Sequence, residues 1–170
     1  MQQQDNRPLL LIPAHLSNIA LTRRIQELTI LNVVLADDDP DEQYFFETAV
    51  KQLPMAIKLE EVTDGVRLLE LLLDARFSLP DIIFLDIMMP RKNGIECLRE
   101  IKCNDILKDI PVIMYSNSVS TNYIVAAYEC GALHFLQKGN YDELPASIGQ
   151  LLSLAIKKPG QVTIQNFMFK

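Results

Sequence analysis

From residue 30 onward, short apolar runs alternate with longer stretches in which apolar residues recur every three or four positions. Runs of the first kind are typical of buried strands, and stretches of the second kind are typical of helices with one buried face. The runs predict five strands, at residues 30–36, 57–62, 81–86, 110–116 and 133–138. The stretches that follow them predict five helices: one at about residues 40–53, one that begins at Gly65 and includes Leu73, one that begins at Gly94 and includes Ile101, one that includes Ile124 and Tyr128 and ends at Gly131, and one at about residues 141–157.

Regular alternation of strands and helices predicts an α/β fold, in which a parallel sheet is covered by helices on both faces. Continuous apolar strands at 30–36, 81–86 and 110–116 suit the middle of such a sheet, whereas 57–62 alternates and suits a position nearer an edge. Asp39 is a plausible N-cap, with Pro40 at the first helical position and Glu42 three residues after the cap. Gly131 suits the residue just beyond the end of a helix.

The two ends of the chain do not follow this rhythm. Residues 17–28 could form an amphipathic helix, and we interpret residues 1–29 as an appended extension. Pro159 and Gly160 end the last helix, and the final "QVTIQNFMFK" alternates like a strand without a local pairing partner. The predicted organisation is therefore an N-terminal extension (1–29), one domain (30–157) and a C-terminal tail (158–170).

Composition narrows the class of protein. A chain of 170 residues with 49% hydrophobic residues can bury the core of one domain. A net charge of -6 argues against non-specific nucleic-acid binding, which depends on lysine and arginine. No apolar run approaches the roughly 20 residues of a membrane span, so no membrane partner is expected.

The cysteines and histidines do not predict a metal or redox site. Cys97, Cys103 and Cys130 lack the spacing of a metal or redox motif, and we interpret them as reduced thiols of a cytoplasmic protein. His15 and His134 are far apart in the sequence, so a zinc site is not expected.

Polar residues instead collect where the predicted strands end. These are Asp37, Asp38 and Asp39 after the first strand, Asp86 after the third, Ser116 and Asn117 after the fourth, and Lys138 after the fifth. The carboxyl ends of parallel strands lie at one edge of the sheet, where ligands bind in such folds. Neighbouring carboxylates repel, and Mg²⁺ relieves that repulsion while keeping water and phosphate oxygens as its other ligands. A carboxylate can also attack phosphorus, with a metal and a lysine stabilising the transferred group, so this set predicts phosphorylation of one aspartate.

Four separated motifs, "VVLADDDPD", "IIFLDIMMPRKNG", "IPVIMYSNS" and "GALHFLQKG", resemble the receiver domain of two-component response regulators. The resemblance covers about residues 30–157. It implies a flavodoxin-like, doubly wound sheet of five parallel strands in the order 2-1-3-4-5.

The resemblance also implies a role for each matching residue. Asp86 is the expected phosphoacceptor, and the expected Mg²⁺ ligands are Asp37, Asp38, Asp86 and the backbone carbonyl of Met88. Ser116, Asn117, Lys138 and the switch aromatic Phe135 form the expected phosphoryl-binding and switch group. The implied phosphodonor is a histidine kinase or a histidine phosphotransfer protein. The expected output surface is the fourth helix, the fifth strand and the fifth helix, and it faces a downstream protein that the sequence does not identify.

Two positions depart from the pattern of the receiver family. The lysine is usually followed by proline, often through a cis bond, but here it is followed by Gly139. Because a non-proline cis bond costs about 2.5–4 kcal/mol, a trans bond or a rebuilt loop is expected. Asn117 stands where the family usually has a smaller residue, and its bulk is expected to slow phosphoryl transfer or narrow the choice of donor.

The leading hypothesis is a single-domain response regulator, because only about a dozen residues follow Lys157. Its output is expected to be phosphorylation-dependent protein binding or transfer of the phosphoryl group along a phosphorelay. It is not expected to be an enzyme beyond its own phosphorylation and dephosphorylation. Gly139 and Asn117 favour the alternative of a pseudo-receiver, a constitutive interaction module. A phosphatase with its nucleophile after the first strand is disfavoured by the acid at the third strand and the lysine at the fifth.

Overall fold

The computed structural model describes residues 30–156 and 162–169 of the chain. The elements are, in order, β1 (Leu31–Ala36), α2 (Pro40–Lys51), β2 (Ile57–Val62), α3 (Gly65–Leu73), β3 (Ile82–Leu85), α4 (Gly94–Cys103), β4 (Val112–Ser116), α5 (Thr121–Glu129), β5 (His134–Gln137), α6 (Leu144–Ile156) and β6 (Met168–Phe169). The five predicted strands and five predicted helices are confirmed, with small differences at their ends. The predicted helix at residues 17–28 lies outside the described residues.

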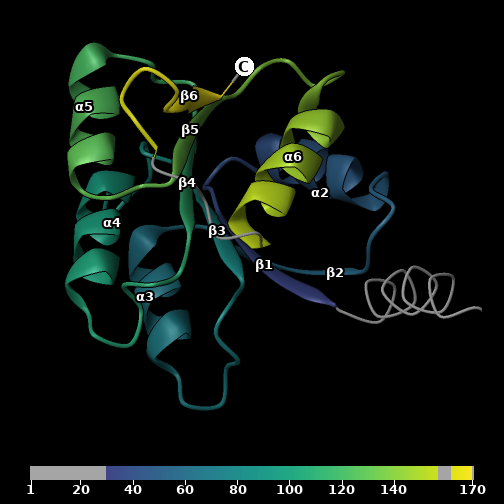
Figure 1. Ribbon diagram of the computed structural model, residues 1–170. Helices are drawn as coiled ribbons and strands as arrows, with labels where there is room; N and C mark the ends of the chain where they lie inside the picture. The colour runs from purple at the N-terminus through teal and green to yellow at the C-terminus, as the bar shows by residue number, and fades with distance from the viewer. Residues whose placement is uncertain (1–29, 157–161, 170) are drawn as a thin grey trace, which may run out of the picture.

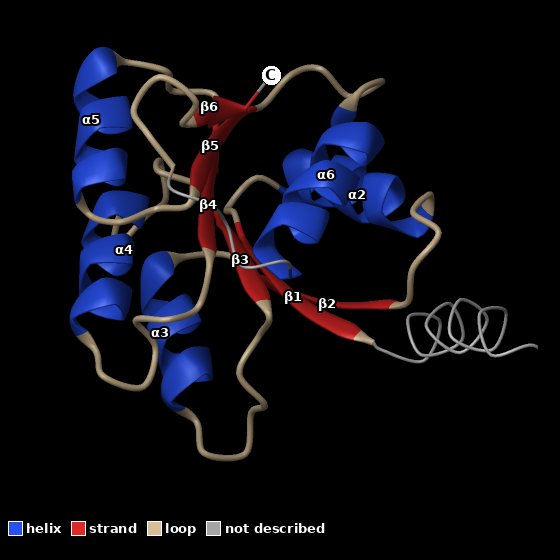
Figure 2. Ribbon diagram, viewed as in Figure 1, coloured by secondary structure: helices blue, strands red, loops and turns tan. Residues whose placement is uncertain are grey.

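The strands form one parallel sheet in the order β2-β1-β3-β4-β5-β6. Helices α2 and α6 cover one face of this sheet, and α3, α4 and α5 cover the other (Figures 1 and 2). The predicted doubly wound order 2-1-3-4-5 is therefore confirmed, and a sixth short strand is added beside β5.

The sixth strand comes from the C-terminal segment for which the sequence indicated no partner. Its Met168 pairs with Phe135 of β5, and the Phe135 N–H donates to the carbonyl of Phe167 at 2.9 Å. The Phe167 ring is fully buried, with its centroid 6.4 Å from that of Phe135 and 5.4 Å from that of Tyr128. The end of the chain thus contributes to the core beside β5.

The core is divided by the sheet. Strands β3 and β4 are buried along their whole length because helices cover both of their faces, as the continuous apolar runs predicted. One cluster packs the sheet against α3, α4 and α5, and the other packs it against α2 and α6. In the second cluster the ring of Phe46 lies 4.8 Å from that of Phe84 and 5.5 Å from that of Tyr115. Within the described parts of the chain, no helix combines the length and apolar character needed to cross a membrane.

Local signals in the sequence mark several helix ends. Asp39 caps α2 by accepting from the Asp41 N–H at 2.9 Å, as predicted. Asn93 and Glu96 form a reciprocal capping box at the start of α4. Gly131, just past α5, has a φ of +86°, which suits the predicted helix stop.

Candidate functional site

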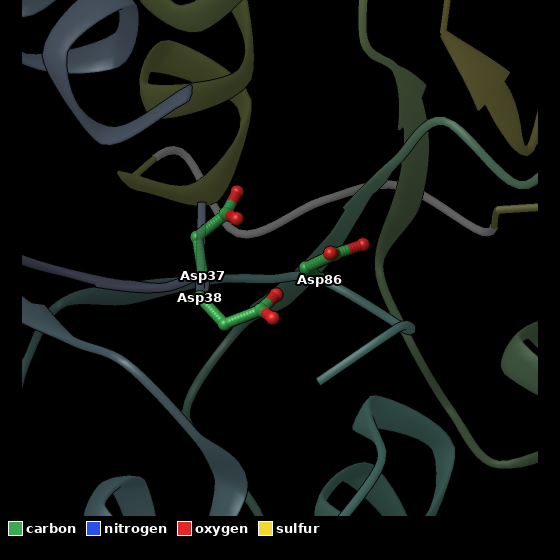
Figure 3. A group of neighbouring side chains, drawn as sticks. All are labelled: Asp37, Asp38 and Asp86. Carbon is green, nitrogen blue, oxygen red and sulfur yellow. The ribbon is translucent and has the colours of Figure 1, made fainter. Parts of the chain in front are cut away.

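Three carboxylates meet at the carboxyl ends of β1 and β3. Asp37 and Asp38 directly follow β1, and Asp86 directly follows β3, the adjacent strand. Each of the three contributes one oxygen to a group in which these oxygens lie within 4.8 Å of one another (Figure 3). The sheet order thus brings together acids that are about 50 positions apart in the sequence.

Asp37 is the most enclosed of the three. Its side chain is fully buried, and its Oδ1 accepts from the Asp39 N–H at 3.1 Å. Its Oδ2 forms a buried ion pair with the Lys138 ammonium, 2.6 Å away. Burial raises the pKa of Asp37 to about 6, because loss of water outweighs the attraction of Lys138. A bound ion would therefore compete with Lys138 for Asp37 Oδ2.

Asp86 is held by the backbone on both sides. Its N–H donates to the carbonyl of Ala36 at 2.9 Å, and its Oδ1 accepts from the Ile87 N–H at 2.6 Å. A Cβ at Gly94 would lie 2.0 Å from the Asp86 carbonyl oxygen, so only glycine lets α4 begin this close to β3. The carboxylate is consequently mounted on a rigid support.

Lys138 brings a positive charge between two of the acids. Its Nζ lies 2.6 Å from Asp37 Oδ2, 3.3 Å from Asp86 Oδ2 and 5.3 Å from the centre of the Tyr115 ring. Burial by itself would lower the pKa of Lys138, but the hydrogen bond and charges of the two aspartates raise it. The Lys138–Gly139 bond is trans, as expected for a non-proline pair. The lysine therefore reaches the site without the proline usual in this position.

The acids have the chemistry of a site for a divalent ion. Three carboxylates against one ammonium leave excess negative charge, and all of the candidate ligands are oxygens, which Mg²⁺ prefers. Asp38 is exposed and open to water, so a bound ion could keep water ligands. Asp37 Oδ2 would add a ligand atom if Lys138 turned away from it. Met88 lies two residues beyond Asp86 with an exposed side chain, and the role of its backbone carbonyl stays a prediction.

The remaining predicted residues lie on the neighbouring strands. Ser116 is buried at the end of β4, and its Oγ accepts from the Ser118 N–H at 3.3 Å. Its carbonyl accepts from the Lys138 N–H at 3.2 Å, which ties it to β5. Asn117 is exposed, and Phe135 is fully buried. Their roles toward a phosphoryl group stay predictions.

The sequence interpretation missed a buried acid beside the site. Glu42 sits three residues after the cap, but it is only 6% exposed and turns toward the sheet. Its Oε1 accepts from Tyr141 Oη at 2.9 Å, and Tyr115 Oη lies 3.4 Å from its Oε2. These tyrosines are 99 and 73 positions away, so no local pattern could have indicated this cluster.

Asp64 is a second buried acid, and it caps the start of α3. Its Oδ1 accepts from the N–H groups of Val66 and Arg67 at 2.9 Å. Its Oδ2 is ion-paired with Arg91, which lies in the loop after Asp86. Burial alone would raise the pKa of Asp64, but Arg91 and the two N–H donors lower it. This ion pair ties the loop that follows Asp86 to the start of α3.

Comparisons with known proteins agree with this geometry. The family described as "Response regulator receiver domain" matches residues 33–148. Response regulator Rcp1 from Synechocystis sp. is 41% identical over 59 residues, which are 35% of this chain and 40% of that protein. A protein-glutamate methylesterase/protein-glutamine glutaminase from Treponema denticola is 35% identical over 95 residues, which are 51% of this chain and 25% of that protein. The matched regions thus span less than half of these relatives.

Solved structures are similar over a larger share of the chain. The Mn²⁺-bound form of response regulator Rcp1 has a TM-score of 0.69 and 25% identity, covering 78% of this chain and 99% of that one. The phosphorylated cyanobacterial phytochrome response regulator RcpA has a TM-score of 0.71 and 24% identity, covering 79% of this chain and 100% of that one. The similarity to RcpA, at 24% identity, supports the fold alone.

Proposed function

Because the chain belongs to the response regulator receiver domain family, we propose that it takes a phosphoryl group on Asp86 from a histidine kinase or a histidine phosphotransfer protein. We further propose that it signals through phosphorylation-dependent protein binding or by passing the group on. The observation that carries the proposal is the position of the Lys138 Nζ, 2.6 Å from Asp37 and 3.3 Å from Asp86. Such an arrangement suits a carboxylate that is about to acquire phosphoryl charge.

In the proposed reaction, an Asp86 oxygen forms a bond to phosphorus as the bond from phosphorus to the donor's histidine nitrogen breaks. The nitrogen leaves with the electron pair of that bond and stays on the donor. The Lys138 ammonium then faces the oxygens of the transferred group and stabilises their charge. Rigid mounting of Asp86 on β3 keeps the attacking oxygen in place.

Asp37, Asp38 and Asp86, with the Met88 carbonyl, would hold Mg²⁺, which when bound neutralises charge on the phosphoryl oxygens. Lys138 pairs with Asp37 in the structure, so it would turn toward the phosphoryl group as charge accumulates on Asp86. Ser116 would donate its hydroxyl to the same group, and Phe135 would shift with it. The result would be a change in the populations of two conformations.

The wider proposal keeps the predicted receiver at residues 30–157, with extensions on either side, and a cytoplasmic location. A pseudo-receiver remains the second candidate, because Asn117 and Gly139 both depart from the usual pattern at the site. That candidate would retain the fold as a constitutive binding module.

Incubation with acetyl phosphate and Mg²⁺, read by intact mass, tests the proposal. The wild-type protein is expected to gain one phosphoryl group, Asp86→Asn is expected to gain none, and the exposed-site control Asp109→Asn is expected to behave like wild type. No gain on the wild type would refute phosphorylation, and an equal gain on Asp86→Asn would refute the role of Asp86. Absence of any backbone shift near Ser116 and Phe135 on adding Mg²⁺ and beryllofluoride would favour the pseudo-receiver.

A further inference from the structure

The residue that follows Lys138 in the β5–α6 loop is the least rigid one available. Gly139 follows the lysine with a φ of +106°, a region that other L-residues rarely adopt. A Cβ built at Gly139 would have no neighbour within 4 Å, so the loop is not held by packing at this point. The ion pairs with Asp37 and Asp86 hold the ammonium itself, so the loop beyond the lysine must be anchored by other contacts.

Those contacts come from α2, which covers the same face of the sheet as α6 (Figure 1). Tyr141, three residues after Lys138, donates its hydroxyl to Glu42 Oε1 at 2.9 Å. Its ring stacks on that of Phe45, with centroids 4.2 Å apart and planes 27° apart. The β5–α6 loop is thus attached to α2 by one charge-assisted hydrogen bond and one aromatic stack.

The same carboxylate connects back to the lysine through β4. Tyr115 Oη lies 3.4 Å from Glu42 Oε2, and the Tyr115 ring lies under the Lys138 ammonium at 5.3 Å. Within residues 30–156 and 162–169, no lysine, arginine or histidine lies within ion-pair distance of Glu42. Its negative charge therefore acts on Lys138 without a closer cation to compensate it.

We propose that Glu42, Phe45 and Tyr141 form a latch that positions Lys138 for contact with the phosphoryl group. The latch takes the place of a stiff residue after the lysine. Its members act through Lys138 and do not touch the phosphoryl group, so they are positioning residues. The proposal rests on the proposed function for its role in transfer, but not for its effect on the lysine itself.

The physical reason lies in the freedom of the lysine side chain. A long flexible side chain loses much conformational entropy when it is held in one place. If the loop is already anchored, part of that loss occurs on folding rather than during phosphoryl transfer, and the ammonium is preorganised. Loosening the latch should leave the acids in place while spreading the positions of the ammonium.

Side-chain order of Lys138 tests the latch without phosphorylation. The change is Tyr141→Phe, which removes the hydroxyl and keeps the stacked ring. The matched control is Tyr44→Phe, on α2 but 63% exposed. In lysine-labelled protein, NMR relaxation is expected to show a lower order parameter at the Lys138 ε-methylene in Tyr141→Phe and no change in the control. An unchanged order parameter in Tyr141→Phe would overturn the proposal, whatever happens in phosphorylation.

Rates of phosphorylation by acetyl phosphate provide a second test. Tyr141→Phe is expected to slow phosphorylation about tenfold. Removal of a whole electrostatic donor lowers a rate by roughly 10²–10³-fold, and this change only loosens the donor. Its Mg²⁺ affinity should be unchanged or tighter, because a loosened Lys138 competes less for Asp37 Oδ2. General damage to the site would instead weaken Mg²⁺ binding, and that result would count against the latch.

A double-mutant comparison separates the latch from an independent effect. In a Lys138→Ala background, Tyr141→Phe should have little further effect on the rate, because the group that the latch positions is gone. An equal slowing in both backgrounds would overturn the proposal. Failure of the wild-type protein to accept a phosphoryl group would refute the proposed function, and the order parameter of Lys138 would still decide on the latch.

Discussion

Asp37→Asn is expected to stabilise the protein at neutral pH in the absence of a divalent ion. The carboxyl of Asp37 is fully buried and has a pKa of about 6, against an ordinary value of 3.8. A raised pKa means that the folded protein binds this proton more tightly than the unfolded chain. The free energy of unfolding therefore falls as the pH rises through the window from 3.8 to about 6, and stays lower above it.

The size of the effect follows from the same two values. A tenfold change in proton affinity corresponds to about 1.4 kcal/mol, so ionising Asp37 costs the folded state about 3 kcal/mol. Asparagine keeps the shape of the side chain and removes its charge. The attraction of Lys138 is already included in this value, because it lowers the pKa of Asp37 below what burial alone would give, and Asp86 remains 3.3 Å from the lysine. The expected net gain is about 1–3 kcal/mol at about pH 7.5, falling to about zero near pH 4.

Urea unfolding of both proteins between about pH 4 and pH 8, with a chelator present, measures this difference. Asp39→Asn is the matched control, because Asp39 is exposed and asparagine caps a helix as well as aspartate does. Added Mg²⁺ at ten times its dissociation constant should stabilise the wild type by about 1.4 kcal/mol and Asp37→Asn by less. A difference independent of pH, or a less stable Asp37→Asn at about pH 7.5 without Mg²⁺, would refute the reasoning.

Three further predictions concern packing and reactivity. Gly94→Ala places a methyl group against the Asp86 backbone. In urea unfolding it should destabilise the fold by about 1–3 kcal/mol, and it should weaken Mg²⁺ binding. An unchanged free energy of unfolding and an unchanged Mg²⁺ affinity would contradict the close approach. Phe167→Ala should cost about 3–5 kcal/mol and expose β6 to hydrogen exchange, whereas a loss below about 1 kcal/mol would show that β6 contributes little. Burial raises the pKa of the Cys97 thiol to about 12, so iodoacetamide should modify the exposed Cys103 first; equal labelling in folded protein would contradict this burial.

Much of the fold could be predicted because its signals are local. Continuous apolar runs marked β3 and β4 as buried on both faces, and alternation marked β2 as an edge strand. Cap residues such as Asp39 and Gly131 marked helix ends through contacts within a few positions. Parallel order then placed every strand's carboxyl end at one edge, which is why Asp37, Asp86 and Lys138 could be grouped before any coordinates were known.

Other features depend on which distant segments meet in space. The alternating C-terminal segment needed β5 as a partner, and only the completed sheet shows that Met168 pairs with Phe135 and that Phe167 fills the core there. The latch could not be foreseen, since Glu42 and Tyr141 are 99 positions apart and neither lies in a pattern that indicates burial.

The sequence by itself determined the elements, their order and the chemical character of the site, because periodicity, caps and residue types act over short distances. Tertiary structure alone decided how the charges interact. The pKa of Asp37 reflects the water that packing removes and the charge of a lysine 101 positions away. In the unfolded chain the carboxylate is hydrated and the lysine is not held beside it. Tertiary structure also decided that a glycine can follow Lys138, because Glu42 and Phe45 of α2 hold the loop through Tyr141.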